Sequence, residues 1–177
     1  MPNYVTGSGI DFIYTFNQYT SQIIDQNVAD TTGTNPGGGL SLQYYPGKFA
    51  GESAPDTFIV YKVLPYTDRE FFMVHWDKLE YKVYSVNYDT LHRVMDTLLI
   101  NLNINILFEQ ANLDAAPLPT FLASGYRLMG CFVRIIDEDE DIYIEGNNYW
   151  MGMIQFNLIY TYIATTISNS QAAYIGA

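Results

Sequence analysis

The residues from 91 to 102 carry an apolar stripe that only a helix can gather on one side. Its residues are at i, i+3, i+4, i+7, i+8 and i+11, and they are Leu91, Val94, Met95, Leu98, Leu99 and Leu102. A helix that is apolar on one side must bury that side against another layer, and extended runs flank this one in the sequence. The stripe therefore predicts a helix lying on a sheet, with Asn87 or Asp89 as its cap.

Extended runs stand before and after this helix. Residues 57–64 read TFIVYKVL, which is β-branched and aromatic, and a second extended run ends at Ser85 after a turn at 66–69. These runs predict a β-hairpin, with a bulge at Asp77 and Lys78, where the apolar alternation changes phase. Two more strands are expected at 126–136 and 149–163.

A further helix is expected near the start of the chain, over about residues 9–28. Ser8 and Asp11 resemble a capping box, and apolar residues then follow at helical spacing. The glycine-rich segment DTTGTNPGGG ends this helix. We expect a loop or arm over about residues 30–56, with irregular chain at 40–54.

The predicted elements follow the order α-β-β-α-β-β. This order predicts an α+β fold with an antiparallel or mixed sheet and helices packed on one face. A chain of 177 residues suits one domain. We expect that domain to cover residues 1–163, with a tail or arm at 164–177.

Acidic residues dominate the charge. The chain has 19 acidic and 8 basic residues, a formal net charge of -11, which disfavours a surface that grips nucleic acid phosphates. Residues 1–28 contain no Lys or Arg, unlike a signal peptide, and polar residues interrupt the apolar stretches before they reach membrane-spanning length. We expect a soluble protein in which Cys131, inside an apolar run, is a buried and unreactive thiol.

Five consecutive acids interrupt the last predicted pair of strands. This acid run consists of Asp137, Glu138, Asp139, Glu140 and Asp141. We expect a solvated hairpin tip, where like charges discourage aggregation between sheet edges. Two other interpretations stay open, namely a charged surface facing a partner and a Mg²⁺ site of a metal-dependent hydrolase using Asp137, Asp139 and Asp141.

Other residues that could take part in catalysis or ligand binding do not form a catalytic signature. His75, His92 and Cys131 are dispersed along the chain, unlike the ligands of a zinc site, and the sequence NPGGGL lacks the GK[ST] step of a phosphate-binding loop. The basic residues Lys78 and Lys82 stand among acids, so they predict an ordinary mixed-charge hairpin surface. We expect a protein that is not an enzyme and has no cofactor.

The chain is rich in aromatic residues, with 16 Tyr, 10 Phe and 2 Trp. Some of them must reach the surface, where Tyr and Trp are enriched at protein interfaces. Tyr149, Trp150, Tyr160 and Tyr162 are the candidates for a subunit interface. The alternative is that tyrosines simply populate exposed sheet faces.

Four segments resemble those of a known group of proteins. They read FIVYKVLPYTDREFFMVHWDKLEYKVYSV, DTLHRVMDTLLINL, YRLMGCFVRII and YWMGMIQFNLIYTYI. Their order and polarity are similar to the tail terminator and tail completion proteins of tailed bacteriophages, a group that includes the minor tail protein U type. The resemblance covers residues 57–163, and this chain departs from the group by its long glycine-rich segment.

The resemblance implies a structural virion protein in the tail or neck, assembled in the host cytoplasm. Such subunits form a ring, typically a hexamer, that caps the tail tube and joins it to the neck. The implied partners are further copies of the chain, the tail tube protein, neck or connector proteins, and the sheath protein of a contractile tail. DNA would pass without specific binding, with the acid run facing either outer solvent or an acidic lumen. Another neck or head-completion adaptor of the same fold is the alternative.

Overall fold

The described part of the chain has an α+β fold built from two helices and a mixed six-stranded sheet. The structure is a computed structural model that describes residues 12–31, 37–49, 51, 53–64, 70–71, 74–102, 126–144 and 146–162. The elements are α2 (Phe12–Asn27), β1 (Gln43–Pro46), β2 (Thr57–Leu64), β3 (Glu70–Phe71), β4 (Val74–Ser85), α3 (Tyr88–Leu102), β5 (Tyr126–Ile144) and β6 (Asn147–Tyr162). The predicted fold class is confirmed, and the structure adds β1 and β3 to the predicted elements.

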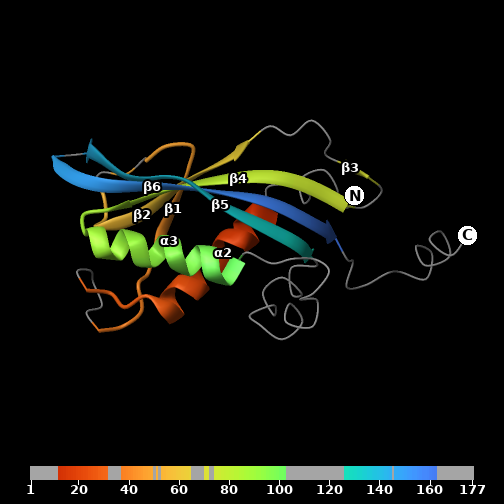
Figure 1. Cartoon of the computed structure of the whole chain (residues 1–177), viewed down its shortest axis with the longest axis horizontal. Helices are drawn as coiled ribbons and strands as arrows, with labels where there is room; N and C mark the ends of the chain where they lie inside the picture. Colours follow the sequence, from red (N-terminus) through yellow and green to blue (C-terminus); the bar gives the residue numbers. More distant parts are fainter. Residues whose placement is uncertain are drawn as a thin grey trace, which may run out of the picture.

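The strands lie in the order β1-β2-β4-β6-β5, with β3 paired to β4 beside this path (Figure 1). Strands β2 and β4 form the predicted antiparallel hairpin, which runs from the pair Thr57 and Ser85 to the pair Leu64 and Lys78. Among the described strands, only β1 is parallel to its neighbour, β2. The edges of the sheet are therefore β1 and the long strand β5.

The predicted bulge at Asp77 is wrong. Strand β4 pairs with β6 without interruption from Val74 opposite Thr161 to Ser85 opposite Trp150. The apolar alternation changes phase because a polar residue, Asp77, occupies a position on the inner side of the strand. There its Oδ2 accepts a hydrogen bond from the Tyr160 hydroxyl at 2.7 Å.

The prediction of irregular chain at residues 40–54 is wrong in part, because this segment contains the edge strand β1. Leu40 and Leu42 are buried, and the Leu40 N–H donates to the carbonyl of Val28 at 2.8 Å. These two apolar anchors return the chain from the end of α2 to the sheet, so β1 can pair with β2. Residues 32–36 of the predicted arm lie outside the described residues.

The acid run lies within β5 and not at the hairpin tip, which corrects the sequence-based expectation. The hairpin closes at the pair Ile144 and Asn147, and Gly146 between them has a φ of 86°. Strand pairing continues past the acids because Ile142 and Ile144 are half-buried. Register shifts between Ile135 and Asp137, and between Asp137 and Glu140, place the run in an irregular part of this edge strand.

The two helices agree with their predicted positions. Helix α3 follows Asn87, whose Oδ1 accepts the Thr90 N–H at 3.0 Å, so Asn87 is the cap. Helix α2 starts at Phe12 in the described chain, and the predicted Ser8 capping box lies outside the described residues. Neither described helix is long and apolar enough to cross a membrane.

The main core joins both helices to alternate residues of β2, β4 and β6. The Phe12 ring stacks on Tyr160 with 3.6 Å between centroids, and Phe16 meets the edge of Phe156 at 5.5 Å. Helix α3 approaches β6 closely at Gly152, where an added Cβ would lie 3.0 Å from the Met95 Cε. Figure 1 shows α2 and α3 below the strands, and we call this side of the sheet the inner face.

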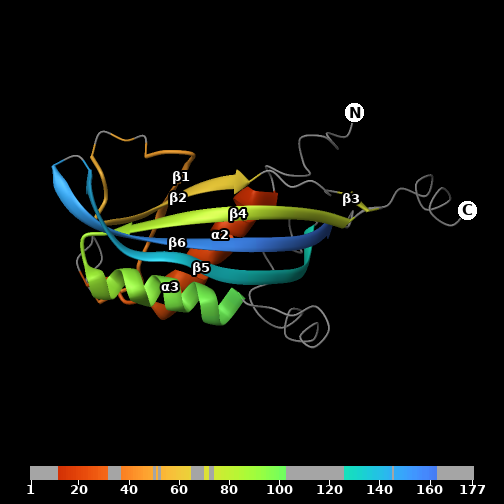
Figure 2. The ribbon, with the colours of Figure 1, turned by 45° about the horizontal axis from the view of Figure 1, so that its top comes forward.

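A second, smaller core lies on the opposite side of the sheet. Phe58, Val60 and Tyr149 form it, and Tyr45 and Phe49 pack against them. The connection between β1 and β2 supplies Phe49 and rises away from the helices (Figure 2). This connection therefore covers one end of the second face.

Strand alternation predicts that two phenylalanines on neighbouring strands contribute very differently to stability. Phe156→Ala should lower the free energy of unfolding by about 3 to 5 kcal/mol, because the ring is fully buried. Phe132→Ala on β5 should cost about 1 kcal/mol or less, because Phe132 is 42% exposed. Urea denaturation of both variants measures this difference, and equal losses would contradict the assigned faces.

Candidate interaction surfaces

The side of the sheet opposite the helices forms the first candidate surface. Because side chains alternate along a strand, the residues between the inner core positions point to this side. Cross-strand pairing places Lys62 opposite Glu80, Glu80 opposite Gln155, and Gln155 opposite Arg134. We call this surface the outer face, and its residues are Lys62, Trp76, Lys78, Glu80, Lys82, Phe132, Arg134, Met153, Gln155, Asn157 and Ile159.

The outer face is basic, although the chain as a whole is acidic. Four of the eight basic residues of the chain lie on it together with Glu80, and the backbone register pairs Asp137 with the outer-face residue Met153. The expectation of an ordinary mixed-charge surface stays a prediction, because Glu80 stands between Lys78 and Lys82 on β4. Asp77 belongs to the inner face, where its Oδ2 accepts the hydrogen bond from the Tyr160 hydroxyl.

Large apolar side chains are exposed on the outer face next to these charges. Trp76 is 41% exposed and Phe132 is 42% exposed. Between them, the Oδ1 atom of Asn157 is buried and has no hydrogen-bond partner among the described residues. Exposed aromatic side chains close to unsatisfied polar groups are typical of surfaces that a partner covers.

A second group of exposed aromatic residues lies where β5 turns into β6. We call it the hairpin end, and it consists of Tyr88, Tyr143 and Trp150. Tyr143 is 71% exposed, and the Tyr88 and Trp150 rings meet edge to face at 5.2 Å. The structure thus places Trp150, one of the predicted interface residues, at the surface.

Two other predicted interface residues are buried within the chain. Tyr149 is 1% exposed, and its hydroxyl donates to the Pro55 carbonyl at 3.0 Å. Tyr160 is also 1% exposed and packs between Phe12 and the sheet. Both therefore belong to the interior. The Tyr162 side chain lies outside the described residues. Period-two alternation within β6 is the signal that separates Trp150 from its neighbour Tyr149.

The side chains of the acid run lie outside the described residues, so the run is placed by its backbone alone. That backbone pairs Asp137 with Met153 and Asp141 with Trp150. Within the described part of the chain, no group of three His, Cys, Asp or Glu residues is arranged to hold a metal ion. The Mg²⁺ site on Asp137, Asp139 and Asp141 stays a prediction.

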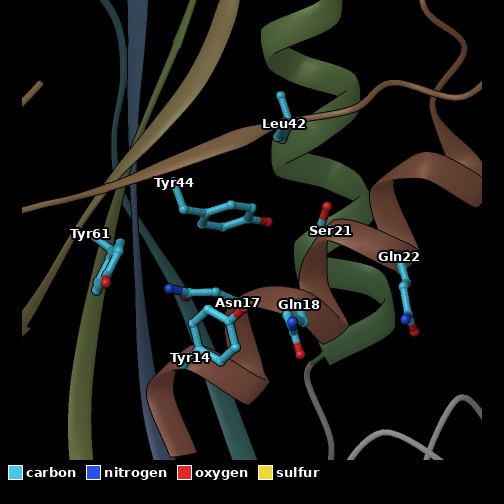
Figure 3. Close-up of a pocket in the computed structure, with 8 residues that line it drawn as sticks. All are labelled: Tyr14, Asn17, Gln18, Ser21, Gln22, Leu42, Tyr44 and Tyr61. Atoms are coloured by element: carbon cyan, nitrogen blue, oxygen red, sulfur yellow. The ribbon is translucent and has the colours of Figure 1, made fainter. Parts of the chain in front are cut away.

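An open cleft of about 540 Å³ lies between α2 and the strands β1 and β2 (Figure 3). Its lining residues are all uncharged at neutral pH, and they are Tyr14, Asn17, Gln18, Ser21, Gln22, Leu42, Tyr44 and Tyr61. Sequence reasoning missed this cleft because β1 was not predicted. Amide and hydroxyl groups of this kind can bind a neutral polar group, but none of them is a general base near neutral pH.

A chain of hydrogen bonds joins α2 to the sheet beside this cleft. The Tyr81 hydroxyl donates to Asn17 Oδ1 at 2.6 Å, and the Thr20 and Tyr44 hydroxyls are 2.7 Å apart. Burial raises the pKa of Tyr44 and Tyr81, so both hydroxyls stay protonated as hydrogen-bond donors. The network is therefore a structural connection between helix and sheet.

Cys131 is a free, fully buried thiol on β5, as predicted. Burial raises the pKa of this thiol, which disfavours the thiolate that nucleophilic chemistry would need. Burial is also the main cause that raises the pKa of nearby Tyr19 to about 12. The inner face at this position is therefore a hydrophobic packing surface.

The hydrogen bond from Tyr81 can be tested by removing a single oxygen atom. Tyr81→Phe should lower the free energy of unfolding by about 1 to 3 kcal/mol, because it leaves the buried Asn17 Oδ1 without this donor. The matched control is Tyr14→Phe on the exposed side of α2, which should change stability by less than about 0.5 kcal/mol. Chemical denaturation measures both values, and a neutral Tyr81→Phe would contradict a stabilising role for the network.

The buried phenols and the buried thiol predict a loss of stability in alkali. Their folded pKa values are raised, so their contribution is complete below the unfolded values of 9.0 for Cys131 and 10.0 for Tyr19. It is lost as pH rises toward the folded values, since the unfolded chain then releases protons that the folded chain retains. Tyr19 alone should contribute on the order of 2 to 3 kcal/mol to this loss.

Urea denaturation at a series of pH values from 9 to 12 measures this loss. Tyr19→Phe should flatten the dependence, because it removes one titrating group. Stability that is constant across this range would show that these groups are accessible to water in the folded chain.

Comparison of the chain with protein-family models finds no match, and no curated protein sequence matches it.

Proposed function

We propose that this chain is a structural subunit that assembles with further copies of itself into a ring. The ring is of the type that caps a bacteriophage tail tube and joins it to the neck. The observation that carries the proposal is the presence of two separate exposed aromatic surfaces on one chain, the outer face and the hairpin end.

The two surfaces lie far apart along the same strand. On β4 and β6, Trp76 pairs with Ile159, whereas Trp150 pairs with Ser85 at the other end of the ladder. Ile159 and Trp150 are nine residues apart, which corresponds to roughly 30 Å of strand. Different surfaces at opposite ends of a subunit suit a heterologous interface, and such interfaces close into rings when the rotation permits.

The sheet edges favour contacts through side chains over the addition of strands. Strand β1 is four residues long and ends in Pro46, which has no N–H to donate. Strand β5 carries register shifts at the acid run, and both bulges and charges discourage strand addition at an edge. The open sheet face and the hairpin end are therefore the better candidates for contacts between subunits.

The chemistry of the cleft and the thiol supports a structural role over an enzymatic one. The cleft is lined by neutral amides, hydroxyls and phenols, and the pKa of Cys131 is raised by burial. Neither site offers an activated nucleophile or a base poised near neutral pH. The net charge of -11 also fits a channel that repels DNA and lets it pass without binding.

The proposed partners are the tail tube protein on one side of the ring and neck or connector proteins on the other. A sheath protein would be a further partner in a contractile tail. Pull-down from separate preparations of tail tubes and of DNA-filled heads discriminates between two roles. A terminator binds the tubes first, whereas a head-completion adaptor binds the heads first.

Assembly can be measured by gel filtration with light scattering over a range of concentrations, followed by negative-stain imaging. We expect a concentration-dependent ring with a channel wide enough for duplex DNA. Trp150→Ala should weaken assembly by about tenfold or more, because buried aromatic anchors dominate interface energies. The control is Ile100→Ala, an exposed apolar residue of α3 outside both surfaces.

A chain that stays monomeric at every concentration and does not bind tail tubes would overturn the proposed function. If Trp150→Ala and Ile100→Ala change assembly equally, the proposed ring stands, but the hairpin end is not part of its interface.

A further inference from the structure

We infer that the cleft between α2 and the strands β1 and β2 is a binding site for an uncharged oligosaccharide. The cleft is separate from the outer face and from the hairpin end, so the inference goes beyond the proposed ring and does not depend on it. Its lining offers amides, hydroxyls and aromatic rings but no general base near neutral pH. The inferred activity is therefore binding without turnover.

One wall of the cleft is a single side of helix α2. Tyr14, Gln18 and Gln22 recur every four residues, so their exposed side chains stand in one row along the helix. Asn17 and Ser21 precede two members of this row, are less exposed and lie deeper in the cleft. From Tyr14 to Gln22 the row is roughly 12 Å long, so the cleft extends along about two turns of the helix.

The opposite wall consists of aromatic side chains from the sheet. Tyr44 of β1 and Tyr61 of β2 are half-buried and pack against the main core. Figure 3 shows the Asn17 amide between the rings of Tyr14 and Tyr44. The cleft therefore presents phenol rings on two sides and an amide between them, within a volume of about 540 Å³ that is typical of sites for small molecules.

Two of the lining side chains are held in place from behind the cleft. The Tyr81 hydroxyl donates to Asn17 Oδ1 at 2.6 Å, and the Tyr44 hydroxyl is 2.7 Å from Thr20 Oγ1. Tyr81 and Thr20 are fully buried. These bonds fix the Tyr44 ring and the Asn17 amide, and they leave the Asn17 Nδ2 group as a donor for a ligand. Polar groups that are positioned in advance lose less conformational entropy when a ligand binds.

The amides and phenols match the two kinds of surface on a sugar ring. Each amide carries donors and an acceptor in one plane, so the amides of Asn17 and Gln18 can bond neighbouring hydroxyl groups of a sugar. The face of an aromatic ring is electron-rich and attracts the polarised C–H groups on the flat side of a sugar. Tyr14, which is 62% exposed, offers such a face at the rim of the cleft.

The absence of charge in the lining disfavours ionic ligands. None of the eight described lining residues is charged at neutral pH, so no ion pair would offset the desolvation of a phosphate, a carboxylate or an ammonium group. The net charge of -11 further opposes the approach of anions. A neutral saccharide meets neither penalty.

An extended peptide fits the cleft less well than a saccharide does. Strand β1 beside the cleft is four residues long and ends in Pro46, so it is a short template for an added strand. Leu42 is the one aliphatic residue among the eight described lining residues. The cleft therefore offers little contact to the apolar side chains by which peptides are selected.

The first test titrates the complete chain with three neutral trisaccharides, namely cellotriose, maltotriose and chitotriose. Calorimetry and saturation transfer from the protein to the sugar protons measure binding. We expect at least one of the three to bind, with an affinity that does not change as salt is added, because the contacts are uncharged. Trigalacturonic acid, which carries a carboxylate on each ring, and the blocked peptide acetyl-Ala-Ala-Ala-amide are the control ligands and should not bind.

The second test changes single exposed residues of α2 and repeats the titration with the trisaccharide that binds. Tyr14→Ala should weaken binding about fivefold or more, whereas Tyr14→Phe should bind like the unchanged chain, because the contact uses the face of the ring. Gln18→Ala should also weaken binding about fivefold, because it removes a hydrogen-bonding amide. The matched control is Gln26→Ala, an exposed glutamine of the same helix outside the cleft, which should not change the affinity.

Several results would overturn the inference. They are no binding of any of the three neutral trisaccharides at millimolar concentration, and tighter binding of trigalacturonic acid or of the peptide. Equal affinities of the Gln18→Ala and Gln26→Ala variants, or an unchanged affinity of Tyr14→Ala, would also overturn it, because the ligand would then lie outside the cleft. Urea denaturation of each variant separates a loss of binding from a loss of folding. Light scattering measures the ring independently, so either proposal can fail without the other.

Discussion

The unbroken pairing of β4 with β6 is the constraint on which the other features depend. Because side chains alternate along both strands, this one register sends Leu79, Tyr81 and Phe156 to the helices. The same register sends Lys78 and Lys82 to the opposite side. A slip of one residue would exchange a hydrophobic core for a row of charges, so core packing fixes the register and the basic outer face together.

The core that fixes this register contains unusually many tyrosines, and each needs a partner for its hydroxyl. Tyr81 donates to Asn17, Tyr149 donates to the Pro55 carbonyl, and Tyr160 donates to Asp77. A buried hydroxyl without a partner costs free energy, so these bonds allow large aromatic rings to be buried without that penalty. They also join helix α2, the connection before β2, and strand β4 to the same sheet.

The distribution of charge gives this acidic chain two unlike surfaces. Acids cluster in the edge strand β5, and half of the basic residues gather on the outer face. Two unlike surfaces on one subunit are what a closed ring of identical subunits requires, since each contact joins different parts of neighbouring copies. The proposed function depends on two different surfaces of one subunit, which are visible only once the strands are paired.

The sequence by itself determined the α+β class, helix α3 with a cap at Asn87 or Asp89, the β2–β4 hairpin and the burial of Cys131. These features follow from local periodicity and from capping chemistry, which neighbouring residues carry. Tertiary structure alone decided that residues 43–46 form a strand and that Asp77 causes no bulge. It also decided that the acid run lies within β5, and that Tyr149 is buried beside an exposed Trp150. The physical reason is that each depends on a partner distant in sequence, such as Tyr160 for Asp77 and Pro55 for Tyr149, and no local pattern encodes such a pairing.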